Sequence, residues 1–224
     1  MAKTYEFPRP ALTVDCAVFG FDLEKIELQV LLIQRSAPPF KGKWALPGGF
    51  VDVGETVETA ARRELEEETG LILGSLEQLQ TFSEPKRDPR EHVVSVAHYA
   101  LVSLIDQNAE AGSDAKRVGW FSVSELPALG FDHGKILSLA IARLQAEITR
   151  QPIGFALLPK KFTLTQLQEL FETVLGRSFD KRNFRRKILS LEVLKNRGEI
   201  KKGPARRAAK LFSFDRKAGS RFQF

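Results

Sequence analysis

Three glutamates, Glu64, Glu67 and Glu68, stand three and four residues apart in a segment rich in helix-forming residues. On a helix this spacing places their carboxylates on one face. Three like charges on one face repel one another unless a cation or a basic group lies among them, and carboxylate oxygens suit Mg²⁺ or Mn²⁺. A metal ion there would offset the charge of a diphosphate and lower the pKa of a bound water. The alternative is an ordinary acidic helix face in contact with solvent.

The residues around these glutamates favour the metal site. They match the Nudix signature from Gly49 to Leu71 at every defined position: glycine, five residues, glutamate, seven residues, then Arg-Glu-aliphatic-any-Glu-Glu-any-Gly-aliphatic. The resemblance implies a catalytic set and a metal-binding set that overlap, with Arg63 orienting a glutamate and Glu55 as an auxiliary ligand. The catalytic set is Arg63, Glu64, Glu67 and Glu68, and the metal set is Glu55, Glu64, Glu67 and Glu68.

A second segment with candidate ligand-binding residues follows, from Lys86 to Val96. It resembles the substrate loop of ADP-ribose-directed Nudix proteins, in which an Asp-Pro-Arg turn precedes a strand. Arginines contact phosphates bidentately, so Arg87 and Arg90 are candidates for that contact. Asp-Pro also favours turns, which leaves a plain polar hairpin as the alternative. The full set of candidate ligand-binding residues is Arg35, Gly48, Gly49, Arg87 and Arg90.

The elements that must position these residues can be read from hydrophobic patterning. Strands are expected at residues 11–19, 28–34, 92–103 and 120–122, and helices at residues 55–69 and 131–149. Gly70 is a natural stop for the first helix. Mixed strands flanked by helices predict an α/β first domain over residues 1–150, and the Nudix resemblance makes it an α/β/α sandwich around a mixed sheet.

A second domain is expected over residues 161–224, after a linker at 151–160 that contains two prolines. Thr163 and Gln166 have the spacing of a helix capping box, and Gly176 follows that helix. Asp180 can cap a second helix, whose Phe184, Ile188 and Leu191 face inward. Strand-like segments at 194–197 and 210–214 flank a basic stretch at 198–209. This order of helix, turn, basic helix and basic hairpin is typical of a winged helix-turn-helix.

The net charge of +6 is unevenly distributed along the chain. Residues 152–224 contain 18 basic and 6 acidic residues, a net charge of +12, whereas residues 1–151 carry a net charge of −6. Basic residues within a winged helix pattern predict contact with double-stranded DNA, although a solvated basic face would have the same composition. The candidate DNA-binding residues are Lys181, Arg182, Arg185 and Arg186 on the second helix, and Lys201, Lys202, Arg206 and Arg207 on the hairpin.

The remaining composition points to the cytoplasm. Cys16 is the single cysteine, so a disulfide framework within the chain is excluded. The N-terminus has no apolar stretch behind a basic end, as a secretory signal would. No run approaches the roughly 18 apolar residues of a membrane-spanning helix.

The combination of both domains resembles the NrtR-type Nudix-related transcriptional regulators. The C-terminal residues that carry the resemblance are 158–167 and 179–188. It implies a homodimeric regulator that binds an operator and senses ADP-ribose or a related nucleoside diphosphate or sugar phosphate. Many members have a degraded Nudix box, but here every acidic position is intact. Two other functions therefore stay open: a Mg²⁺-dependent hydrolase of ADP-ribose or a related compound, and a basic protein–protein interaction module on a Nudix scaffold.

Overall fold

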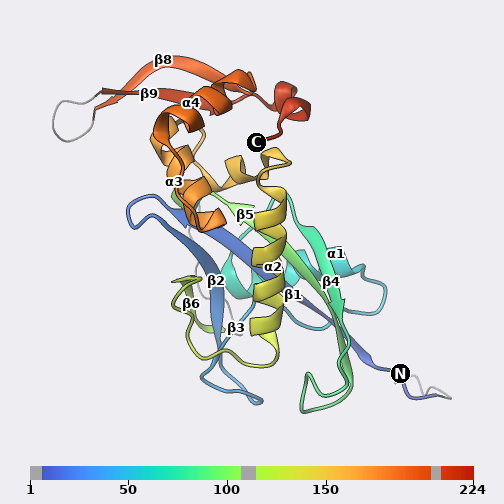
Figure 1. Cartoon of the computed structure of the whole chain (residues 1–224). Helices are drawn as coiled ribbons and strands as arrows, with labels where there is room; N and C mark the ends of the chain where they lie inside the picture. The colour runs from blue at the N-terminus through green and yellow to red at the C-terminus, as the bar shows by residue number, and fades with distance from the viewer. Residues whose placement is uncertain (1–6, 107–114, 203–207) are drawn as a thin grey trace.

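The computed structural model describes residues 7–106, 115–202 and 208–224. Its first part is built on a mixed sheet of six strands (Figure 1). The strands are β1 (Ala11–Asp22), β2 (Glu27–Arg35), β3 (Trp44–Ala45), β4 (Glu77–Phe82), β5 (Val93–Val102) and β6 (Ala115–Ser122). Their order is β3-β2-β1-β5-β4, and β6 pairs with β2. The central strands β1 and β5 run parallel, with Ala11 opposite Val93 and Gly20 opposite Val102, while the other pairs are antiparallel.

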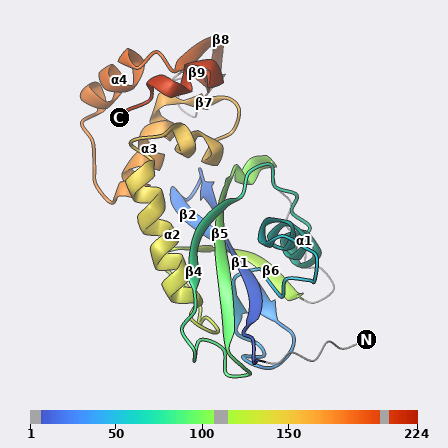
Figure 2. The same ribbon diagram turned by 90° about the vertical axis from the view of Figure 1, so that its right-hand side faces the viewer.

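Two helices cover the opposite faces of this sheet (Figure 2). They are α1 (Val57–Thr69) and α2 (His133–Glu147), and a short 3-10 helix, η1 (Leu104–Asp106), follows β5. One apolar core lies beneath α1 and includes Cys16 and Leu65, and another lies beneath α2 and includes Phe19 and Leu144. The expected α/β/α sandwich is therefore confirmed. Helix α1 begins at residue 57 because Thr56 caps it by accepting a hydrogen bond from the Thr59 amide.

Parts of the sheet differ from the sequence-based expectation. Strand β4 was not expected, because within its six residues only Leu79 is buried and the rest are largely polar. Strand β6 begins at Ala115 rather than at Trp120, because its first residues extend the pairing with β2 as far as Arg35. Edge strands such as these depend on backbone pairing more than on buried side chains, so hydrophobic patterning detects them poorly.

The second part of the chain is a winged helix domain, as expected. It comprises η2 (Pro152–Leu157), β7 (Phe162–Thr163), α3 (Leu164–Leu175), α4 (Lys181–Ser190), β8 (Leu194–Lys202), β9 (Ala208–Phe214) and η4 (Arg216–Arg221). The three strands pair in the order β7-β9-β8. The capping box of Thr163 and Gln166 is present, and the Asp180 side chain caps α4. Strand β8 continues to residue 202, which shortens the hairpin tip, and Arg206 and Arg207 lie outside the described residues.

The two parts share one apolar core. The cluster beneath α2 continues into the winged helix through residues of α3 such as Leu167 and Leu170. The Gln145 side chain of α2 donates a hydrogen bond of 2.9 Å to the Val174 carbonyl of α3. Phe155, in the segment expected to be a linker, is buried and stacks on Phe214 at 4.4 Å between ring centroids. Within the described residues, no helix is both long and apolar enough to cross a membrane.

Candidate functional site

The guanidinium of Arg63 organises the acidic residues of the Nudix box. It binds the Glu55 carboxylate bidentately at 3.0 and 2.9 Å, and it lies 2.8 Å from Glu64 and 3.2 Å from Glu67. It also donates to the carbonyl oxygen of Phe50 at 3.0 Å. Arg63 therefore connects the helix to the loop before it and supplies the cation that the clustered carboxylates require.

Two glycines allow the preceding loop to approach those carboxylates. The Gly48 amide donates a 2.8 Å hydrogen bond to the Glu68 carboxylate, and its φ of 153° favours glycine. A Cβ on Gly48 would collide with the Val14 carbonyl oxygen, and one on Gly49 would collide with the Glu64 carboxyl group. The glycines expected from the signature thus bring the backbone directly against the acidic helix face.

The pKa values of two of these acids are shifted in opposite directions. Burial raises the pKa of Glu64, and this effect outweighs the opposing influence of Arg63. The hydrogen bond from Arg63 lowers the pKa of Glu55, whose side chain is 11% exposed. The two acids therefore differ in how readily each holds a proton, as acids in functional sites often do.

The donor chemistry of this face suits a hard divalent cation, but the side chains are not gathered around a metal position. Among the described residues, no group of three acidic, histidine or cysteine side chains is close enough together to hold one. Arg63 accounts for this, because it holds Glu55, Glu64 and Glu67 around itself. Glu67 is half exposed, so its side chain has room to reorient.

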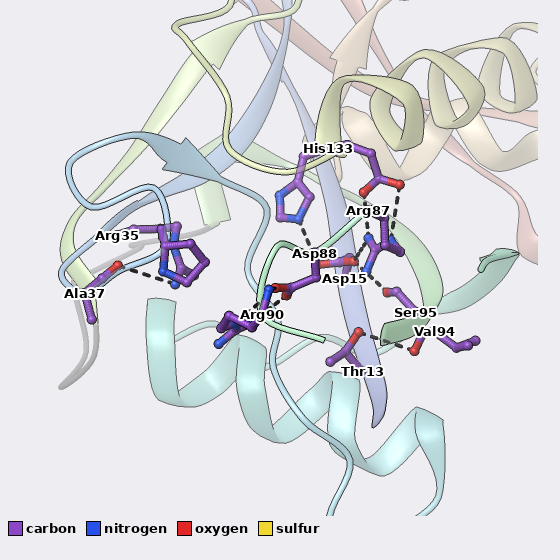
Figure 3. A network of polar contacts seen from close by, with 12 residues as sticks. Thr13, Asp15, Arg35, Ala37, Arg87, Asp88, Arg90, Val94, Ser95 and His133 are labelled. Carbon is purple, nitrogen blue, oxygen red and sulfur yellow. Dashed lines mark hydrogen bonds and ion pairs between the residues drawn. The ribbon is translucent and has the colours of Figure 1, made fainter. Parts of the chain in front are cut away.

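A cavity of about 130 Å³ adjoins the Nudix loop at Gly48, Gly49 and Phe50. Its base is a buried ionic network centred on Asp15 of β1 (Figure 3). Asp15 accepts hydrogen bonds from Arg87 at 3.0 Å and from Ser95 at 2.6 Å. Arg87 also binds Asp132 with both Nε and Nη2, at 3.2 and 2.8 Å. The side chain of Arg87, expected to contact phosphate, is only 4% exposed and is occupied by these two carboxylates.

His133, the first residue of α2, completes this network. Its Nδ1 accepts a 2.8 Å hydrogen bond from the Leu46 amide, so the ring proton lies on Nε2, which faces Asp15 at 3.2 Å. Burial alone would raise the pKa of Asp15, but His133, Arg87 and Ser95 together hold it well below its ordinary range. These contacts therefore favour the ionised carboxylate of Asp15 at the base of the cavity.

The rim of the cavity alternates guanidinium groups with aromatic rings. Arg35 lies over the Phe131 ring at 4.9 Å, and Arg90 lies 5.9 Å from the same ring and 5.4 Å from that of Phe50. Arg90 is ion-paired with Asp88 at 2.7 Å, whereas Arg35 donates to the Pro39 carbonyl at 2.7 Å. Flat cationic and aromatic surfaces at the mouth of a cavity suit a planar base or a phosphate group.

Sequence reasoning missed several residues of this site, among them Asp15, Phe50, Phe131 and His133. An available signal for Asp15 was a charged residue within an otherwise apolar strand. Phe131 has a left-handed backbone with φ of 52°, which is unusual for a non-glycine residue and sets its ring against His133. That backbone conformation leaves no mark in the sequence.

The candidate DNA-binding residues of α4 fall on two faces. Lys181, Arg182 and Arg186 are exposed, opposite the buried Phe184 and Ile188. Arg185 is half-buried and turns toward α3, where its Nη2 lies 3.4 Å from Thr165 Oγ1. Figure 1 shows the β8–β9 hairpin projecting past α4 at the end of the molecule away from β3. Lys201 and Lys202 belong to the last part of β8.

The geometry defines a class of protein: a Nudix domain joined to a winged helix domain. The NUDIX domain model matches residues 9–140, and the model of the NrtR DNA-binding winged helix domain matches residues 154–214. The chain belongs to the Nudix family, in the branch of NrtR-type regulators whose Nudix domain is followed by a DNA-binding winged helix domain.

Three similar proteins have informative descriptions. The ADPR responsive transcriptional repressor NtrR of Acinetobacter baylyi is 36% identical over 213 residues, which cover 93% of this chain and 84% of that protein. The ADP-ribose pyrophosphatase of Methanocaldococcus jannaschii is 47% identical over 128 residues, 57% of this chain and 71% of that protein. The structure of Shewanella oneidensis NrtR complexed with a 27mer DNA matches with a TM-score of 0.79 and 31% identity, covering 95% of this chain and 97% of that one.

The buried network predicts a large stability cost for the Asp15→Asn substitution. It removes one of the two carboxylates that neutralise buried Arg87, so the free energy of unfolding at neutral pH should fall by about 3 kcal/mol. Because the folded pKa of Asp15 is depressed, its contribution is present above the pKa of an unfolded aspartate and is lost as the pH falls through the lower folded value.

Urea denaturation of both proteins measures this difference. The matched control is Asp52→Asn, whose exposed carboxylate lies 4.0 Å from Arg63 and should contribute less than about 1 kcal/mol. Equal losses from the two substitutions would contradict the assignment of Asp15 as a structural centre.

Proposed function

We propose that the chain is a homodimeric transcriptional regulator of the cytoplasm, which binds an operator through α4 and the β8–β9 hairpin and responds to ADP-ribose. The single observation that carries this proposal is the exposed basic face of α4, with Arg182 and Arg186 one turn apart over the buried Phe184 and Ile188. Helices of this kind enter the major groove, where arginine reads guanine bidentately. A two-fold dimer would match a roughly palindromic operator.

ADP-ribose would bind at the cavity beside the Nudix loop. The rim offers Arg35 and Arg90 for the diphosphate and Phe50 and Phe131 for stacking against the adenine. Arg87, held by Asp15 and Asp132, would act as a positioning residue rather than as a direct phosphate contact. The names of the Acinetobacter and Methanocaldococcus relatives, one responsive to ADPR and one acting on ADP-ribose, support this ligand class.

A divalent cation, Mg²⁺ or Mn²⁺, would be held by Glu64, Glu67 and Glu68, with Glu55 as an auxiliary carboxylate. When bound, the ion would offset the charge of the diphosphate and lower the pKa of a coordinated water. Arg63 would stay bound to the Glu55 carboxylate and hold helix α1 against the loop that precedes it. Gly48 and Gly49 would let the diphosphate approach the backbone beside this face.

Helix α2 offers a direct connection between the ligand cavity and the DNA-binding domain. Its first residue, His133, contacts Asp15 and Leu46 at the cavity. Near its other end, Gln145 donates to the Val174 carbonyl of α3, and the Thr149 carbonyl accepts from the Phe224 amide at 2.7 Å. A ligand that shifts His133 would therefore also shift α3 and, through it, α4.

Substitutions on α4 and on the hairpin should have different effects on DNA binding. A preferred duplex is first selected from a random pool with the wild-type protein. Arg182→Ala or Arg186→Ala should cost about 1–3 kcal/mol on that duplex and relax the preference at one position. Lys202→Ala should weaken binding to all sequences and reduce the slope of log affinity against log salt concentration by about one.

Fluorescence anisotropy with the selected and a scrambled duplex, at several salt concentrations, measures both effects. Lys217→Ala, which removes one exposed charge from η4, is the matched control and should leave sequence preference unchanged. If the wild type enriches no sequence, the domain does not read DNA and the proposed function is wrong.

Coupling between the two sites predicts reciprocal effects. Saturating selected DNA should weaken ADP-ribose binding about 5- to 150-fold, and ADP-ribose should weaken DNA binding by the same factor. Calorimetry without divalent metal measures both affinities. Gln145→Ala should reduce the coupling factor while leaving each separate affinity unchanged. Equal ADP-ribose affinity with and without DNA would exclude coupling for this ligand.

The intact acidic set favours a second candidate function, hydrolysis of ADP-ribose to AMP and ribose 5-phosphate by addition of water across the diphosphate. Glu67→Gln keeps the size and helix propensity of the side chain but removes one charge. It should lower AMP release at least about a hundredfold in excess Mg²⁺ or Mn²⁺ and weaken Mn²⁺ binding measured by electron paramagnetic resonance.

Glu66→Gln is the matched control, because Glu66 is the exposed, variable position of the same box and should tolerate the change. Absence of wild-type turnover on ADP-ribose with either metal would rule out the hydrolase and leave the regulator.

A further inference from the structure

A second cleft, of about 780 Å³, lies between the two domains. One wall is formed by residues 72–75 after α1 and 101–103 at the end of β5. The opposite wall is formed by η2, residues 158–162 and parts of β8, β9 and η4. Its volume falls within the range of small-molecule sites, which occur preferentially at domain interfaces. The cavity beside the Nudix loop shares no lining residue with it.

The charges that line this cleft are positive. The side chains of Lys160, Lys161, Arg197 and Arg216 line it, and no acidic residue is among the described residues of its wall. Lys161 is ion-paired with Glu199 at 2.7 Å, so the other three cations give the cleft its net charge. A concave surface that combines several cations with low-dielectric walls favours an anionic ligand.

The rest of the lining is apolar and partly aromatic. Phe155 of η2 and the half-buried Phe214 of β9 stack with an interplanar angle of 14°. Ile153 lies in the same wall, and Leu101 lies in the opposite wall. An aromatic pair beside cations suits a ligand that has both a flat apolar ring and a phosphate. Inorganic phosphate alone would leave this apolar wall unused.

Ser103 provides an independent indication of a ligand. It lines the cleft and is 8% exposed, yet its Oγ atom has no hydrogen-bond partner among the described residues. Buried hydroxyl groups are nearly always hydrogen-bonded, and an unsatisfied one costs free energy. The Oγ atom itself is covered from solvent, so a polar atom of a bound molecule would reach it through a small shift of the surrounding side chains.

We propose that this cleft is a second ligand site, which takes a nucleoside phosphate. Lys160, Arg197 and Arg216 bind the phosphates, Phe155 and Phe214 contact the base, and Ser103 hydrogen-bonds to a polar group. Because the walls belong to both domains, the bound ligand would add contacts that span them. The consequence for DNA affinity rests on the proposed function, whereas binding in the cleft does not.

Photolabelling of the full chain with 8-azido-ADP, followed by peptide mapping, tests the location directly. We expect label on peptides that contain residues 152–162 or 211–217, and excess ADP should compete it away. Adenosine and pyrophosphate, tested separately as competitors, should each compete less well than ADP. If pyrophosphate competes as well as ADP, the site takes free phosphate and the nucleoside part of the proposal is wrong.

Arg197→Gln/Arg216→Gln should reduce the cleft label at least tenfold. The control pair Arg150→Gln/Lys217→Gln removes two charges outside the cleft and should retain the label. Ser103→Ala should weaken ADP binding without lowering the unfolding temperature of the free protein, which separates a ligand contact from a structural role.

Label confined to peptides of the Nudix cavity, such as those containing residues 87–91, would overturn the second site while leaving ADP-ribose sensing intact. Cleft labelling that is unchanged in the double variant would also overturn it. If that variant instead loses dimerisation in sedimentation analysis and the wild type takes no label in the cleft, the cleft is a subunit contact.

Discussion

The buried carboxylate of Asp15 is the interaction on which the arrangement of the Nudix domain depends. It binds Arg87 from the loop before β5, Ser95 from β5 and His133 from the start of α2. Segments far apart in the sequence therefore meet at the Asp15 carboxylate. Because this charge is buried, leaving it unpaired would cost several kcal/mol of stability, on the order of the cost of breaking a buried ion pair. The Phe131 ring stacks on His133, so its position at the cavity rim depends on that contact.

Arg63 neutralises a second cluster of charges, the carboxylates of the Nudix box. Clustered glutamates would repel one another, and a single guanidinium neutralises Glu55, Glu64 and Glu67 while also holding the Phe50 carbonyl. The carboxylates of the acidic face are thus arranged around the guanidinium group of Arg63. Any external cation has to compete with Arg63 for Glu64 and Glu67, so the affinity of the site for metal depends on how readily these side chains exchange partners.

The features that sequence could predict are those encoded locally. The Nudix box, the Thr163 capping box and the inward stripe of α4 each lie within one helix and its caps, where spacing alone fixes the geometry. The participation of Asp15 and Phe131 in the cavity depends on contacts between residues more than 70 positions apart and on a left-handed backbone. Strand β4 was missed because Leu79 is its only buried residue and Phe82 at its end is the only other apolar side chain that packs on the core.

The shared core beneath α2 has a consequence for how the molecule can come apart. Leu144 and Ile148 pack in the same apolar cluster as Leu167 and Leu170, so separating the domains would transfer buried hydrocarbon into water on both sides. The two domains are therefore not independent folding units joined by a flexible linker. Heat or denaturant should therefore melt both halves in a single cooperative step.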